Sequence, residues 1–298
     1  MTLIKVFIRQ NNTIKNNSMQ KIIVPIDFSD HARYALNFAM QFNKLINGKI
    51  LLLHVLELPA ASVNFGADIT SSTAEVVYRR ELLDGTSSKL HEWAEIVKDA
   101  GQEVAIRLEY GSPYVGLGNE VANEGGDWVI IGSKGASGLK EIFLGSNAER
   151  IIRHSTCPVI TVKGETDLSA IKSMVFPTSL EPEQYSIAEK VKKFQQMLKL
   201  NIHLLSVMTP YNFLTEKIAT EQLQEFANKL GLVNYDIGAV DADYSEEGII
   251  NYANQVNAGA IVMGTHGRTG IAHLFGGSRA EDVANHSKIP VVTFKLDK

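Results

Sequence analysis

The chain has only one cysteine, Cys157, among its 298 residues. A single cysteine cannot form a disulfide within the chain, which fits a reducing compartment such as the cytoplasm. It also cannot supply a cysteine-based metal cluster. Because Cys157 precedes Pro158 beside an expected strand, we interpret it as a buried structural thiol rather than a reactive one.

Long apolar runs and a basic excess are missing as well. No run of about 18 apolar residues occurs, so we expect no segment to cross a membrane. The net charge of -4 offers no basic surface of the kind that binds nucleic acid. The chain also lacks a Walker A sequence, a G-x-S-x-G nucleophile elbow and a set of kinase motifs. Nothing marks a general base placed to activate water.

Residues 1–18 are rich in asparagine. Their apolar stretch is too short and too interrupted for a signal peptide, and Met19 directly precedes the first good strand. We therefore expect residues 1–18 to be a disordered extension or a mispredicted start. With about 150 residues per domain as a guide, we divide the rest into domains at 19–163 and 171–298, joined by a linker around 163–170.

One glycine motif occurs twice. Its first copy is Gly132-Ser133-Lys134-Gly135, then nine residues, then Gly145-Ser146; its second is Gly264-Thr265-His266-Gly267, then nine residues, then Gly277-Ser278. A short apolar run before each copy predicts a buried parallel strand. The glycines let the backbone turn sharply and approach a ligand, and Gly-Ser predicts a helix start with serine as N-cap. Free N–H groups at helix starts favour phosphate.

The alternative interpretation is that these glycines only form tight turns. A gene duplication preserves turns as faithfully as it preserves binding sites, so the repeat alone does not separate the two interpretations.

Both copies match the pattern G-x2-G-x9-G-[S/T] at every fixed position, and the chain resembles the universal stress protein family from Met19 onward, as a tandem of two domains. The resemblance implies an α/β fold with two doubly wound, Rossmann-like domains. Each would hold a five-stranded parallel sheet in the order 3-2-1-4-5. We expect the two domains to pack as a pseudo-dimer through the last strands, 158–162 and 290–295, whose apolar edges would otherwise be exposed.

Alternating strand and helix patterns support this fold class. In the first domain we expect strands at 21–27, 49–56, 104–108, 127–131 and 158–162. Its helices begin at Ser29 or Asp30 and end at Gly48, run over 74–100 with an interruption at Gly85, and start at Ser112 and Ser146. In the second domain we expect strands at 174–177, 202–208, 233–240, 260–263 and 291–295, with helices at 183–199, 215–230, 245–255 and from Ser278. An extra segment around 59–73 is a candidate lid or a tolerated surface insertion.

The resemblance places an adenine-nucleotide site where the strand order reverses. Asp27 would bind the ribose hydroxyls, with Pro25 and Ile26 before it, and Val55 would offer backbone to the adenine. The ribose and phosphates would meet Ile131, Gly132, Lys134, Gly135, Gly145, Ser146 and Asn147. The second site would use Val207, Met263, Gly264, His266, Gly267, Gly277, Ser278 and Arg279. The implied cofactor is ATP or another adenine nucleotide with Mg²⁺, which the phosphates rather than a protein cage would hold.

Several of these residues have ordinary alternatives. Asp27 could serve as a helix-capping or turn carboxylate, and Lys134 as a solvated loop charge. His266 and His273 have no recognised metal spacing, so we expect surface or phosphate-facing histidines and no metal site. Aligning Pro25 with Pro177 places the neutral Ser179 opposite Asp27. Losing one charged hydrogen bond, about 1.5–3 kcal/mol, predicts a second site weaker by about tenfold to a hundredfold.

The predicted function is a regulatory adenine-nucleotide-binding protein of the stress response. One alternative is a slow ATP hydrolase or an autophosphorylating protein with Ser146 and Ser278 as acceptors, as in some members of the family. Another is a scaffold whose nucleotide sites are vestigial. The expected partners are the nucleotide and the second half of the same chain, and the sequence leaves open whether two copies pair further.

Overall fold

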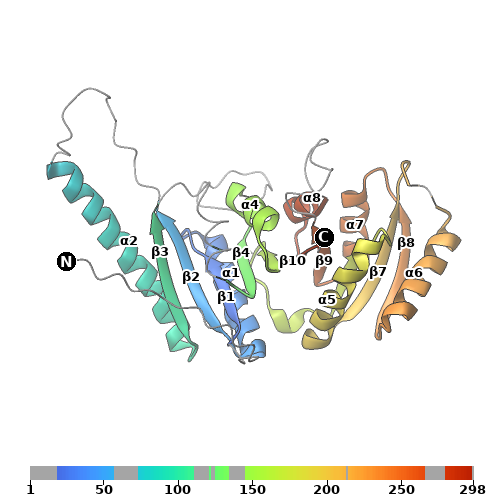
Figure 1. The fold of residues 1–298 in the computed structure, drawn as a ribbon, viewed down its shortest axis with the longest axis horizontal. Coiled ribbons are helices and arrows are strands. Elements are labelled where there is room, and N and C mark those ends of the chain that lie inside the picture. The colour runs from blue at the N-terminus through green and yellow to red at the C-terminus, as the bar shows by residue number, and fades with distance from the viewer. Residues whose placement is uncertain are drawn as a thin grey trace, which may run out of the picture.

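The computed structural model describes residues 19–56, 73–110, 121, 125–133, 145–212, 214–265 and 279–296. Strands and helices alternate along the chain (Figure 1). The strands are β1 (Lys21–Pro25), β2 (Lys49–Leu56), β3 (Val104–Tyr110), β4 (Trp128–Gly132), β5 (Val159–Val162), β6 (Ser173–Pro177), β7 (Asn201–Met208), β8 (Tyr235–Asp241), β9 (Ala260–Thr265) and β10 (Val291–Lys295). The helices are α1 (Asp30–Ile46), α2 (Thr73–Asp99), α4 (Ser146–His154), α5 (Pro182–Leu198), α6 (Glu216–Leu230), α7 (Ser245–Gln255), α8 (Arg279–His286) and the 3-10 helix η1 (Leu168–Ala170).

The strands form one continuous ten-stranded sheet in the order β3-β2-β1-β4-β5-β10-β9-β6-β7-β8. Counted from the first strand of each half, the order is 3-2-1-4-5 twice, which confirms the predicted fold class. The halves meet at β5 and β10, which pair antiparallel. The Thr161 hydroxyl donates to the Val291 carbonyl at 3.2 Å, and the Thr293 hydroxyl donates to the Val159 carbonyl at 3.4 Å. These reciprocal bonds confirm a pseudo-dimer joined through the last strands.

Two hydrophobic layers lie on the two faces of this sheet. Helices α1, α2, α5 and α6 cover one face, and α4, α7 and α8 cover the other (Figure 1). Each layer contains residues from both halves of the chain. On the first face, four rings pack across the joint with centroids 4.9–6.4 Å apart, namely Phe42, Trp128, Phe194 and Phe294. The two halves therefore share one interior.

Two predictions about glycines in helices are wrong. Asn47, with a left-handed φ of 50°, caps the end of α1 in place of Gly48, because asparagine tolerates this conformation. Gly85 does not interrupt α2, which runs unbroken for 27 residues. Gly101, with φ 71°, follows the end of α2 as predicted.

The segment predicted as a linker is packed against the first half. Within it lies η1, whose Leu168 is buried in the shared core. The Gln41 side chain of α1 accepts from the Leu168 N–H at 2.9 Å and donates to the Thr166 carbonyl at 3.1 Å. The connection is therefore anchored to α1 of the first half instead of forming a free linker.

Other predictions fall partly or wholly outside the described residues. These are the extension at 1–18, nearly all of the extra segment at 59–73, and the helix from Ser112, of which only Val121 is described. Cys157 is free and half-buried rather than fully buried, and burial raises the pKa of its thiol, which agrees with a structural rather than a reactive role. Among the described helices, none combines the length and the hydropathy that a membrane span needs.

Candidate functional site

Asp27 follows β1 and forms a hydrogen-bonded turn. Its Oδ1 accepts from the backbone N–H of Ser29 at 3.1 Å and from the Ser29 hydroxyl at 2.6 Å. The same hydroxyl accepts from the Ala32 N–H at 3.2 Å and so caps α1. Phe28 between them has a left-handed φ of 63°, which turns the chain from strand into helix. Asp27 therefore has the alternative role considered above, that of a turn carboxylate. Its side chain is half-buried and lies just before the start of α1.

His54 ties the end of β1 to β2. The Ile26 N–H donates to the Leu53 carbonyl at 2.8 Å, and His54 Nδ1 lies 2.6 Å from the Ile26 carbonyl oxygen. Because a carbonyl only accepts, Nδ1 carries the proton of this bond. Burial lowers the pKa of His54, while the bond to Ile26 and the charge of Asp27 act in the opposite direction. His54 is thus a neutral histidine that holds the carbonyl of Ile26, the residue before Asp27. We call this bond the histidine clamp.

An aromatic group lies beside this turn. The Phe28 ring faces the His54 ring at 4.8 Å and meets the Trp93 ring edge-on at 5.8 Å. The Arg33 guanidinium lies 4.0 Å above the Trp93 ring. Sequence reasoning missed Phe28 and Trp93 as site neighbours, because Trp93 comes from α2 and nothing in the sequence signals its approach.

The carboxyl ends of three strands meet at this edge of the sheet. β1 pairs in parallel with β2 on one side and with β4 on the other. Pro25, Val55 and Ile131 therefore come to one edge with Asp27, as the predicted site requires. Pro25, Val55 and Ile131 are buried, so at this edge they offer mainly backbone to a ligand.

The first glycine of each motif serves strand–helix packing. A Cβ on Gly132 would lie 2.5 Å from the carbonyl carbon and oxygen of His31 in α1. A Cβ on Gly264 would collide with the Ile187 side chain of α5. Gly132 is therefore required for the fold itself, because it meets backbone, whereas a side chain at Gly264 would only require Ile187 to move.

Gly145, not Ser146, is the N-cap of α4. Gly145 has an extended backbone, and Ser146 is the first helical residue. The Gly145 N–H donates to the Ser133 carbonyl at 2.7 Å, which closes the base of the first glycine loop. A phosphate at this helix start would therefore meet the N–H groups that follow, those of Ser146 and Asn147, which have no partner within the helix.

Six predicted site residues lie outside the described residues, so their roles stay predictions. They are Lys134, Gly135, His266, Gly267, Gly277 and Ser278.

The second half repeats the backbone turn with different side chains. The Thr178 N–H donates to the Leu205 carbonyl at 2.9 Å, as Ile26 does to Leu53, and Leu180 repeats the left-handed φ at 62°. Ser179, exposed, takes the place of Asp27, and the buried Ser206 takes that of His54. The turn is therefore conserved between the halves while its carboxylate and its histidine clamp are not.

The remaining second-half residues lie near the matching edge. Val207 is half-buried near the end of β7, and Met263 is buried beside Gly264 in β9. Arg279 is exposed as the first residue of α8.

An acidic hollow of about 610 Å³ opens where β7 and β8 end against α7. Asp241, Asp243 and Glu247 line it together with Asn251 and Gln255. Among the described residues, no group of three histidines, cysteines or carboxylates is arranged to hold a metal. Sequence reasoning missed this hollow, whose negative charge lies in the half that lacks Asp27.

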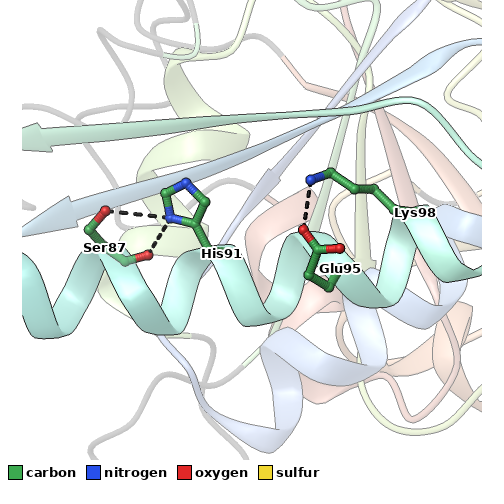
Figure 2. Close-up of polar contacts among 4 residues, drawn as sticks. All are labelled: Ser87, His91, Glu95 and Lys98. Carbon is green, nitrogen blue, oxygen red and sulfur yellow. Dashed lines mark hydrogen bonds and ion pairs between the residues drawn. The ribbon is translucent and has the colours of Figure 1, made fainter.

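A second hollow, of about 600 Å³, lies along α2 beside Ser87, His91 and Glu95. Figure 2 shows that these side chains follow one another along a single helix. His91 Nδ1 lies 2.8 Å from the Ser87 carbonyl, and Glu95 pairs with Lys98 at 2.7 Å. The histidine therefore donates to backbone instead of activating the serine, and the carboxylate does not orient the histidine. These residues do not form a catalytic triad.

The fold and the two glycine motifs define a tandem of doubly wound domains with helix starts at the carboxyl edge of the sheet. The model of the universal stress protein family matches residues 19–163 and 170–295. The chain belongs to this family.

Individual relatives match either nearly the whole chain or one half of it. Universal stress protein E of Escherichia coli is 24% identical over 304 residues, covering 94% of this chain and 95% of that protein. A universal stress protein of Methanocaldococcus jannaschii is 31% identical over 153 residues, 48% of this chain and 94% of its own. The crystal structure of a universal stress protein from Archaeoglobus fulgidus superposes with a TM-score of 0.73 at 22% identity, covering 92% of this chain and 98% of that one.

Proposed function

We propose that the chain is a regulatory protein of the stress response that binds an adenine nucleotide, ATP with Mg²⁺, in its first half. The observation that carries the proposal is the half-buried Asp27 carboxylate at the end of β1, beside the end of β4. Strand order reverses between these two strands, and doubly wound sheets bind ligands at that point.

The residues at this edge suit a nucleotide. Asp27 would accept the ribose hydroxyls and the Val55 backbone would meet the adenine. The N–H groups of Ser146 and Asn147, which have no partner within α4, would hold phosphate oxygens. Lys134 would add a positive charge from the loop between them. Mg²⁺ would neutralise the phosphates, which are its usual ligands.

The second site would bind nucleotide more weakly for two reasons. Ser179 offers a neutral hydroxyl where Asp27 offers a carboxylate. The neighbouring hollow carries Asp241, Asp243 and Glu247, whose negative charges oppose a polyphosphate nearby. We place the protein in the cytoplasm, without nucleic-acid or membrane partners, on the strength of its single cysteine and its net charge of -4.

Calorimetry of the nucleotide-free protein with ATP and Mg²⁺ tests this proposal. Asp27→Asn keeps an oxygen that accepts from Ser29, so the turn survives while the charge is lost. We expect it to weaken the first site by about tenfold to a hundredfold. Ser29→Ala is the matched control: it removes the helix cap and the hydroxyl bond to Asp27 but keeps the carboxylate and its bond from the backbone N–H, so it should weaken ATP binding less than Asp27→Asn does.

Further variants separate the two sites and the alternatives. Gly145→Val and Gly277→Val should each remove one class of site, and Ser179→Asp should tighten the second. Phosphate release on the same samples would identify a slow hydrolase. Absence of ATP binding by the intact protein would overturn the proposal and favour a scaffold with vestigial sites.

A further inference from the structure

A bidentate ion pair links the helices that follow the two glycine motifs. Arg153 Nη2 lies 2.6 Å from Glu281 Oε2, and Arg153 Nε lies 3.1 Å from Glu281 Oε1. The Glu281 side chain is only 6% exposed, against 35% for Arg153. Two parallel bonds fix the orientation of the guanidinium as well as its distance. Removing Arg153 would take this cation away from a carboxylate that is almost fully buried.

The positions of the pair in their helices connect the two motifs. α4 has nine residues and begins directly after Gly145, and Arg153 stands in its last turn. Glu281 stands in the first turn of α8, which begins directly after Ser278. The rise of an α-helix places Arg153 about 10 Å from the start of α4. A short rigid path therefore runs from the first helix start, through the ion pair, to the second.

This contact is not repeated by the pseudo-symmetry of the chain. When Gly145 is aligned with Gly277, Glu149 corresponds to Glu281, and Asn285 takes the place of Arg153. Asn285 carries no charge to offer Glu149. The first half therefore supplies a cation to the start of α8, whereas the equivalent position of the second half carries the neutral side chain of Asn285.

We propose that Arg153 is a positioning residue for the second glycine motif and that its bridge to Glu281 couples the two nucleotide sites. The inference rests on the proposed function, because a phosphate at the start of α4 is what would set the bridge. Contacts with phosphate reduce the motion of the start of α4. Because α4 is a short helix that moves as a unit, the motion of Arg153 in its last turn is reduced as well. Through the ion pair, Glu281 and the first turn of α8 become less mobile as well. The second site then loses less conformational entropy when it binds nucleotide, so its affinity rises. Arg153 also neutralises a carboxylate beside the place of the second phosphate.

Hydrogen–deuterium exchange of the full chain tests the coupling. Gly277→Val serves as the background, so that nucleotide at the second site does not protect α8 directly. We expect ATP with Mg²⁺ to slow amide exchange in both α4 and α8, by about fivefold in α8, the lower end of typical coupling. Adding Arg153→Met should abolish the α8 response while the α4 response and the ATP affinity of the first site remain.

Two further variants guard against misfolding as an explanation. Glu281→Gln keeps the shape and one hydrogen bond of the pair, and should reduce the α8 response. Thr161→Val removes a different bond between the halves, and should leave that response intact. A response in α4 without one in α8, or an α8 response that survives Arg153→Met, would overturn the coupling and leave the nucleotide site standing. No ATP binding by calorimetry would overturn both.

Discussion

At the scale of single residues, Asp27 and His54 act on the same short piece of backbone. Asp27 Oδ1 holds the turn that follows it, and His54 Nδ1 holds the carbonyl that precedes it. Both bonds fix where the Asp27 carboxylate stands before any ligand arrives. The second half has neither residue, so its turn keeps the backbone path without this double fixation.

The pH dependence of stability should report the His54 clamp. Burial lowers the pKa of His54 below the ordinary value of about 6.5 for histidine, so the unfolded chain takes up a proton more readily than the folded protein. The contribution of neutral His54 to the free energy of unfolding is therefore complete above about pH 6.5 and is lost as pH falls below that value. Urea unfolding at about pH 7.5 and pH 5.5 should show a larger loss for the parent than for His54→Gln, which still donates to Ile26. Equal losses would contradict a buried neutral histidine.

Some features of the first site could be predicted from the sequence, and others could not. Asp27, Val55 and Gly132 lie at or just after the ends of recognisable strands, so their meeting at one edge follows from the order of a doubly wound sheet. The sequence does not show that Phe28 takes a left-handed φ, since any residue type may be forced there by a turn. Nor does it show that the Gly145 N–H is already bonded to Ser133, because that contact closes a loop.

At the scale of elements, α2 shows how a helix outweighs one unfavourable residue. Gly85 stands in the middle of this 27-residue helix, exposed, with open space around the position of a Cβ. The helix packs Leu90, Trp93 and Val97 into the shared core. Burial of those side chains exceeds the cost of about 1 kcal/mol that glycine adds inside a helix.

Gly85→Ala should therefore stabilise the protein by about 0.5–1 kcal/mol, because alanine loses less backbone entropy on folding and meets nothing at this position. Urea unfolding curves of the two proteins measure the gain. Gly101→Ala is the matched control, since φ 71° penalises a side chain there, and it should lower stability. A loss of stability in Gly85→Ala would contradict the unbroken helix.

Most elements were predictable from periodicity, and the misplaced boundaries have local causes. Alternation, helical spacing and the glycine motifs located the described strands and α-helices to within a few residues, but not the 3-10 helix η1, which lies in the predicted linker. The end of α1 was misassigned because Asn47 and Gly48 can both terminate a helix, and only tertiary contact decides between them. In the structure, a Cβ on Gly48 would collide with the Gln20 backbone, so glycine is needed there for packing rather than for capping.

At the scale of the whole molecule, the halves behave as one body because their interiors are continuous. The sheet runs through the β5–β10 joint, the four rings cross it on one face, and the Arg153–Glu281 pair crosses it on the other. Shared burial on this scale favours a single cooperative unfolding transition over two independent ones.

A substitution deep in the second half should therefore destabilise the first. Phe226, buried against Phe176 and Tyr185, lies in the second half, while both tryptophans, Trp93 and Trp128, lie in the first. Phe226→Ala should cost about 3–5 kcal/mol and shift the tryptophan fluorescence and circular dichroism midpoints together in urea.

The matched control is Val233→Ala at a position 58% exposed in the same half, which should move neither midpoint. If the fluorescence transition of the Phe226→Ala protein stayed at its parent position, the halves would be independent folding units.

The joint between β5 and β10 is symmetric in one respect and asymmetric in another. Thr161 and Thr293 exchange reciprocal bonds, as two copies of one domain would. The Arg153–Glu281 contact has no counterpart, because Asn285 stands in place of a second arginine. In a dimer of identical subunits, every mutation appears on both sides and must be compatible with itself. One chain that holds both halves escapes that requirement, so each half can change its ligand preference by its own mutations while the other half keeps the ancestral one.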